Sequence, residues 1–116
     1  MKRLRNPRTG IHQGDVLVFA DFEDGGAMWT GVGTRERRKE VTFDEVFASP
    51  PAVQLSVSLW DMDTSAAIRA ELVAENVTNT GFDIVFRTWS DSRIARMRAS
   101  WIAIGELPFQ DDWGIE

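Results

Sequence analysis

With 116 residues, 27% of them charged and 43% hydrophobic, the chain has the size and composition of one globular domain and not of a disordered protein. It contains no cysteine and a single histidine, His12, which excludes a disulfide framework, cysteine catalysis, a thiolate metal site and a multi-histidine metal site. The net charge of −5 argues against non-specific nucleic-acid binding, and no apolar run approaches the roughly 20 residues that a membrane-inserted helix needs.

Residues 1–14 are basic and then polar, and we expect them to form an N-terminal arm or an interface strand whose fold depends on a partner. Asn6 and Pro7 stand where a signal peptide would have its apolar stretch. We therefore expect no signal peptide, which leaves a cytoplasmic protein, a particle component or export by another route. Residues 15–116 are expected to form one domain.

Short elements are predicted in the first half of this domain. Residues 15–20 contain a continuous apolar run, long enough for one buried strand. The acidic turn over 21–24 lacks the spacing of an EF-hand loop, so we expect it to be solvated. Residues 27–32, with Met28-Trp29, predict a short strand. The mixed charge run over 35–40 predicts a solvated loop or a sheet edge, with a phosphate-binding patch as the alternative.

The second half has clear strand periodicity. A short strand is predicted at 41–43, and apolar and polar side chains then alternate, as in half-buried strands, over residues 53–59, 68–74, 82–89 and 93–104. Turn residues separate these segments, and none shows helical periodicity over three turns. Residues 107–116 form a tail with Trp113. The pattern indicates an all-β fold, an antiparallel β-sandwich.

The sequence favours binding over catalysis. Asp61 and Asp63 are two carboxylates in the loop that follows the strand predicted over 53–59. No nucleophile motif occurs in the sequence, so we expect no enzyme activity. Trp89 falls on the polar side of its strand, just before Ser90 and Asp91. An aromatic ring with one exposed face beside hydrogen-bonding groups suits a sugar. The equal alternative is that Trp89 covers the core edge or fills a subunit interface.

An ordered string of motifs resembles the H-type lectin domain family. It consists of Phe47-Ala48-Ser49-Pro50-Pro51, the strand Val53 to Leu59, Arg69, Gly81-Phe82, Thr88-Trp89 and Ser100-Trp101-Ile102-Ala103-Ile104. The resemblance implies a six-stranded antiparallel β-sandwich that assembles as a homotrimer or hexamer. It also implies galactose- or N-acetylgalactosamine-type sugars bound without a metal in clefts between subunits.

Two sugar contacts carry over by position from that resemblance. Arg69 matches the arginine that hydrogen-bonds the sugar, and Trp89 matches the tryptophan supplied by the adjacent chain. The sequence departs from the family in two places: Ser90 stands where other members have histidine, and the loop over 31–40 is short and basic, without a matching aspartate. Its basic residues suit an acidic polysaccharide, or alternatively an inter-subunit salt-bridge loop. They are Arg35, Arg37, Arg38 and Lys39.

We therefore predict a bacterial-type lectin for cell adhesion, with no cofactor, no metal and a carbohydrate site formed by Arg69, Trp89, Ser90 and Asp91. The alternative is a structural spike or fibre component of a phage-like particle that keeps the fold with a weak or lost sugar site. The last strand carries two outward-facing arginines, Arg96 and Arg98. They also favour an oligomer, because acids of a neighbouring subunit, such as Glu71 or Glu75, could pair with them.

Overall fold

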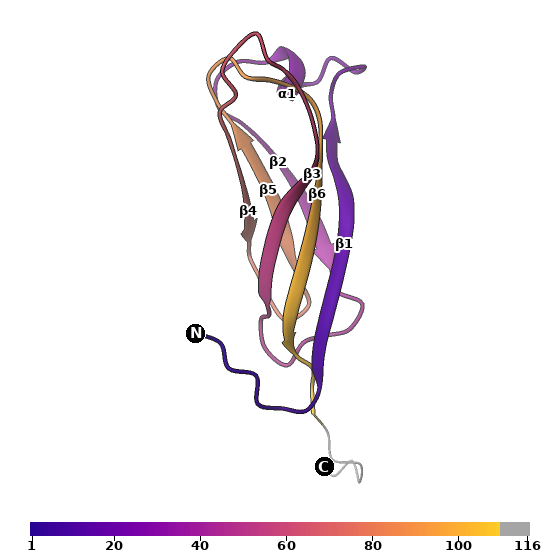
Figure 1. Ribbon diagram of the computed structural model, residues 1–116. Helices are drawn as coiled ribbons and strands as arrows, with labels where there is room; N and C mark the ends of the chain where they lie inside the picture. The colour runs from indigo at the N-terminus through magenta and orange to yellow at the C-terminus, as the bar shows by residue number, and fades with distance from the viewer. Residues whose placement is uncertain (110–116) are drawn as a thin grey trace.

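A computed structural model describes residues 1–109 and consists of two three-stranded antiparallel sheets (Figure 1). The strands are β1 (Thr9–Ala20), β2 (Arg35–Thr42), β3 (Ala52–Asp63), β4 (Ala70–Glu75), β5 (Gly81–Thr88) and β6 (Arg93–Glu106), and one helical turn is α1 (Ala27–Thr30). The sheet orders are β1-β6-β3 and β2-β5-β4. This arrangement confirms the predicted six-stranded all-β sandwich. Residues 110–116, with Trp113, lie outside the described part.

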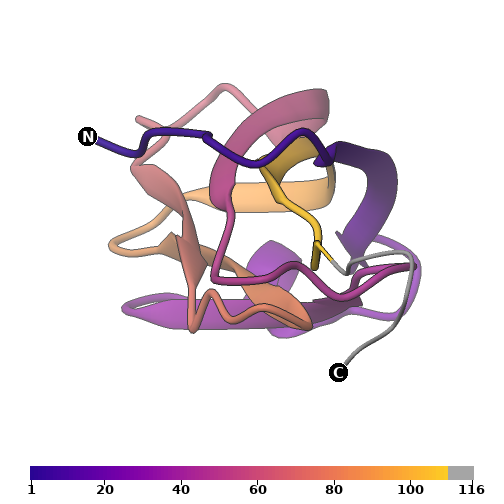
Figure 2. The same ribbon diagram turned by 90° about the horizontal axis from the view of Figure 1, so that it is seen from below.

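The two sheets face each other, as the view along the strands shows (Figure 2). Between them lies one core rich in aromatic side chains. The alternation predicted for 82–86 is confirmed, because Phe82, Ile84 and Phe86 all point inward and are almost fully buried. Burying each such side chain stabilises the fold by roughly 1.5–3 kcal/mol. Other core members are Phe19, Met28, Phe43, Phe47, Ile94, Met97 and Trp101.

The first strand begins earlier than its apolar run suggests. Residues 9–14 pair in register with residues 106–101 of β6, so β1 starts at Thr9 and the expected boundary at residue 14 falls inside a strand. Backbone hydrogen bonds to a central strand need no apolar side chain, which is why the hydrophobic pattern missed this stretch.

The strand predicted around Met28-Trp29 is wrong, because Ala27–Thr30 form the helical turn α1. A buried carboxylate organises this turn. Asp21 accepts hydrogen bonds from the Met28 backbone N–H at 2.9 Å and from the Arg37 guanidinium at 2.7 Å. The expectation of a solvated acidic turn therefore holds for the exposed Glu23 and Asp24 but not for Asp21.

A bulge in β3 changes the side on which Trp60 lies. The register with β6 shifts between Val57 and Leu59, so Trp60 pairs with the inward-facing Met97. Its ring packs edge-on against Phe86 with a centroid distance of 5.7 Å. Strict alternation predicts a polar-side tryptophan at this position, and an inserted residue reverses that prediction.

The outer face of the β2-β5-β4 sheet carries a ring of ion pairs. Glu36 and Glu75 each bridge Arg38 and Arg87, with N···O distances of 2.7–2.9 Å. Residues 35–40 belong to β2, an edge strand, which was one of the two structures predicted for this charge run. Hydrogen bonds from Arg87 and Arg38 hold the pKa of Glu75 below its usual range, and those from Arg38 and Arg87 do the same for Glu36.

We expect Glu75→Gln to lower the melting temperature near neutral pH but not in acid. A depressed carboxyl pKa stabilises the fold above the pKa of the unfolded chain, and this contribution is lost as the pH falls through the folded-state pKa. The gap between the variant and the natural chain should therefore close between neutral pH and about pH 3, followed by thermal unfolding. Glu40→Gln, on the same sheet face and outside the ring of ion pairs, is the control. A gap that stays constant with pH would contradict this account.

Candidate functional site

The structure brings together the backbone of the predicted site residues at the end of the sandwich that carries α1. Arg69 precedes β4, whereas Trp89, Ser90 and Asp91 form the turn between β5 and β6. Ser92 joins the two segments: its hydroxyl accepts a hydrogen bond from the Arg69 N–H at 2.9 Å and lies 3.3 Å from the Trp89 carbonyl oxygen. The Thr88 hydroxyl donates to the Arg69 carbonyl at 2.6 Å.

The side chains of all four predicted residues are exposed. Trp89 is 40% exposed, and Ser90 has the left-handed φ of 64°, which turns the chain sharply beside the ring. The Arg69 guanidinium has no hydrogen bond or ion pair with residues 1–109 of its own chain. An exposed indole, a guanidinium and a carboxylate at one end of the sandwich supply the stacking surface, donors and acceptors that recognise a polar ring.

Arg35 fixes the loops behind this site. It is only 8% exposed, and its guanidinium donates to the carbonyl oxygens of Gly33, Ala27, Met28, Ser92 and Ser90 at 2.9–3.4 Å. The carbonyl of Ser90 also accepts the Gly33 N–H at 2.8 Å. The planar, multi-donor guanidinium suits this role, because it satisfies several carbonyls at once. Sequence reasoning missed it, since Arg35 reads as one member of a charge run.

The same geometry corrects the interpretation of the basic segment as an anion-binding loop. Arg35 is buried, Arg37 pairs with Asp21, and Arg38 pairs with three carboxylates of its own sheet. Carboxylates of the chain neutralise Arg37 and Arg38, whereas backbone carbonyls surround the charge of Arg35. An acidic polysaccharide therefore finds no open arginine among them. Lys39, the fourth basic residue of the segment, is exposed.

We expected Arg96 and Arg98 to pair with acids of a neighbouring subunit, but both arginines form ion pairs within their own chain. Arg96 contacts Asp61 at 2.9 Å, and Arg98 contacts Asp15 at 3.3 Å. The proposed acidic partners, Glu71 and Glu75, contact Arg87 instead. These arginines therefore do not themselves call for an oligomer.

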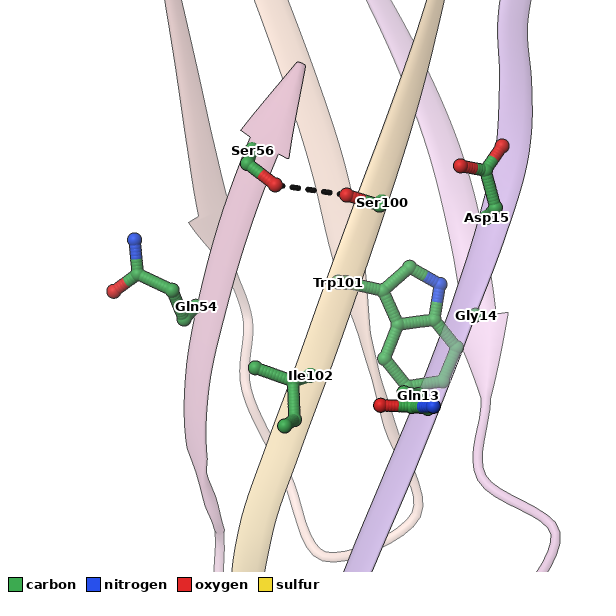
Figure 3. Close-up of a pocket in the computed structure, with 8 residues that line it drawn as sticks. All are labelled: Gln13, Gly14, Asp15, Gln54, Ser56, Ser100, Trp101 and Ile102. Carbon is green, nitrogen blue, oxygen red and sulfur yellow. Dashed lines mark hydrogen bonds between the residues drawn. The ribbon is translucent and has the colours of Figure 1, made fainter. Parts of the chain in front are cut away.

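A hollow of about 560 Å³ lies on the outer face of the β1-β6-β3 sheet (Figure 3). None of its lining residues belongs to the turn that holds Trp89. Ser56 and Ser100 hydrogen-bond across neighbouring strands at 2.7 Å, and Gln13 and Gln54 flank Ile102. The Trp101 ring lies under Gly14, where any Cβ would come within 2.7 Å of it. With no exposed aromatic ring among its lining residues, this hollow is less suited to a sugar than the Trp89 turn.

Two further observations bear on ligand class. In the part of the chain that the structure describes, no three His, Asp or Glu side chains are grouped closely enough to hold a metal ion. Across residues 1–109, no helix combines the length and the apolar character that crossing a membrane requires.

Comparison with known proteins places these features in a family. The H-type lectin domain matches residues 38–104. A protein of Fuscovulum blasticum named "ATP synthase subunits region ORF 7" is 54% identical over 108 residues, covering 93% of this chain and 94% of that protein. One of the discoidin-1 polypeptides of Dictyostelium discoideum is 37% identical over 89 residues, covering 74% of this chain and 35% of its own length.

A solved structure agrees with the fold. Wild-type discoidin II of Dictyostelium discoideum superposes with a TM-score of 0.74 at 24% identity, over 87% of this chain and 38% of that one. The chain thus spans little more than a third of the discoidins it matches, and nearly the full length of the Fuscovulum protein.

Proposed function

We propose that this chain, which belongs to the H-type lectin domain family, is a carbohydrate-binding protein and not an enzyme. The family and the discoidin relatives support carbohydrate binding in general. The ligand we propose is a neutral galactose- or N-acetylgalactosamine-type sugar on a surface glycan, as in cell adhesion. Neutral sugars fit better than acidic ones, because Arg37 and Arg38 of β2 pair with carboxylates of the chain and Arg35 is buried.

The observation that carries this proposal is the exposed pair of Arg69 and Trp89 at one end of the sandwich, fixed by Ser92. In our proposal the guanidinium hydrogen-bonds sugar hydroxyls and the indole stacks on the apolar C–H face of the ring. Ser90 and Asp91 add a hydroxyl and a carboxylate at the rim. In each cleft the two residues come from different protomers, with Arg69 from one protomer and Trp89 from its neighbour.

The assembly proposed is a homotrimer or a hexamer built on the part of the outer face of the β1-β6-β3 sheet that surrounds Ile11, Ile102 and Ile104. Charge distribution supports this choice. That part carries the three isoleucines with uncharged glutamines and serines, whereas the ion pairs of this face lie nearer the end that carries α1. The outer face of the other sheet is covered by ion pairs. Ile11 is 64% exposed in the isolated chain. A depletion of charge at the centre of a surface is typical of subunit interfaces.

Chelation is expected to leave sugar binding intact. The proposed contacts come from Arg69, Trp89 and the turn between them, and none of these needs a cation. Calorimetric titration with N-acetylgalactosamine, with and without EDTA, measures this directly, and the two dissociation constants should agree. Loss of binding in EDTA that calcium restores would contradict the metal-free site.

A further inference from the structure

A second hollow, of about 500 Å³, lies beside the end of β1, and an aromatic ring and charged groups line it together. Its lining includes Phe22, which is 58% exposed, and the ion pair of Asp61 and Arg96 at 2.9 Å. Glu23 and Asp24 also line it. An aromatic ring together with carboxylates and a guanidinium offers both stacking and hydroxyl recognition.

The exposed ring is held in place before any ligand arrives. Phe22 packs edge-on against Trp29 with centroids 5.1 Å apart, and the Arg93 guanidinium lies 4.1 Å from the Trp29 ring centroid. The turn that carries Phe22 is anchored by the buried Asp21, whose backbone carbonyl accepts the Gly26 N–H at 3.0 Å. A large apolar ring exposed on a rigid support is a preorganised contact, which lowers the entropic cost of binding.

The stack also connects this hollow to the Trp89 turn. Arg93 opens β6 directly after Ser92, and its Nε donates to the Trp29 carbonyl at 3.1 Å. Phe22, Trp29 and Arg93 therefore run from the hollow to the turn that carries Trp89. The hollow and the proposed sugar site lie at the same end of the sandwich.

Charge selects among possible ligands. Glu23, Asp24 and Asp61 face the hollow with Arg96 as the one cation among its lining residues, so the lining is net negative. Carboxylates repel acidic sugars and accept hydrogen bonds from neutral hydroxyls.

From these contacts we propose that the Phe22 hollow is a second carbohydrate subsite that takes a neutral sugar residue. The ligand class is then an extended neutral glycan and not a single sugar. The inference rests on the proposed function, because it assigns a further residue of the same glycan to this end of the molecule.

The test compares galactose, a neutral galactotetraose and tetragalacturonic acid by calorimetric titration of the assembled protein. The natural chain should bind the galactotetraose about tenfold more tightly than galactose. It should bind tetragalacturonic acid no more tightly than galactose. Phe22→Ala should abolish that tenfold preference and leave the dissociation constant for galactose unchanged. Phe109→Ala is the matched control, because Phe109 is also highly exposed, at 57%, but follows the far end of β6.

Three results would overturn the subsite. The first is a galactotetraose preference that survives Phe22→Ala in a folded protein. The second is an equal loss of affinity for galactose and galactotetraose in that variant. The third is that the natural chain binds tetragalacturonic acid as tightly as the galactotetraose, or more tightly. Binding of neither neutral sugar by the natural chain would overturn the proposed function itself, and the subsite with it.

Discussion

Replacing Trp89 by alanine is expected to weaken glycan binding by at least about tenfold while the protein stays folded. The indole is 40% exposed, lies in a turn and has no aromatic partner among residues 1–109, so its removal does not empty the core. What disappears is the surface on which a sugar stacks, a loss of roughly 2 kcal/mol or more for a central contact residue. Calorimetric titration with N-acetylgalactosamine measures the effect.

Trp60→Ala provides the matched control, because Trp60 is as exposed as Trp89, at 42%, but packs against the core residue Phe86. The Trp60 variant should lower the melting temperature and leave the dissociation constant unchanged. Unaltered binding in a folded Trp89→Ala variant would show that the sugar is held elsewhere.

Arg69→Ala is expected to cause a loss of similar size by a different route. Its backbone N–H and carbonyl keep their hydrogen bonds to Ser92 and Thr88 in the variant, so the local fold persists. The guanidinium contributes charge-assisted hydrogen bonds to sugar hydroxyls, of the order of 1.5–3 kcal/mol. Affinity should therefore fall at least about tenfold. Arg69→Lys, which keeps one donor and the charge, should bind with intermediate affinity.

Mixing the two variants tests whether each site is shared between subunits. If Arg69 and Trp89 of one cleft come from different chains, refolding Arg69→Ala with Trp89→Ala subunits should restore some intact clefts. Light scattering must first show trimers or hexamers. Weak binding in both variants with no recovery in the mixture would leave the residues in place but contradict the inter-subunit geometry.

Much of the fold follows from period-two patterning and turn residues. The strands from residue 53 onward were predictable because inward-facing apolar residues recur at every second position, as Phe82, Ile84 and Phe86 do. Where backbone pairing decides the structure, the alternation of apolar and polar residues does not predict it. β1 extends to Thr9 on hydrogen bonds to β6, and a bulge in β3 turns Trp60 inward.

The site was only partly predictable, because its hydrogen bonds and ion pairs join segments that are far apart in the sequence. The exposure of Arg69 and Trp89 agrees with the predicted alternation, although both residues lie just outside β4 and β5. The alternation does not predict that the Ser92 hydroxyl joins their two segments. Arg35 reads as a surface cation because sequence cannot show that backbone carbonyls of α1 and the Trp89 turn surround it. Likewise Arg96 and Arg98 find their carboxylates within the chain only once the strands pair.

The central claim, that this member of the H-type lectin family binds carbohydrate at the Arg69–Trp89 end, is tested most directly by a glycan array. The array would be probed with the purified protein beside its Trp89→Ala variant. We expect the natural chain to bind neutral glycans that end in galactose or N-acetylgalactosamine, with the signal lost in the variant. An array silent for the natural chain would contradict the claim and favour a structural particle component that keeps the fold without its sugar site.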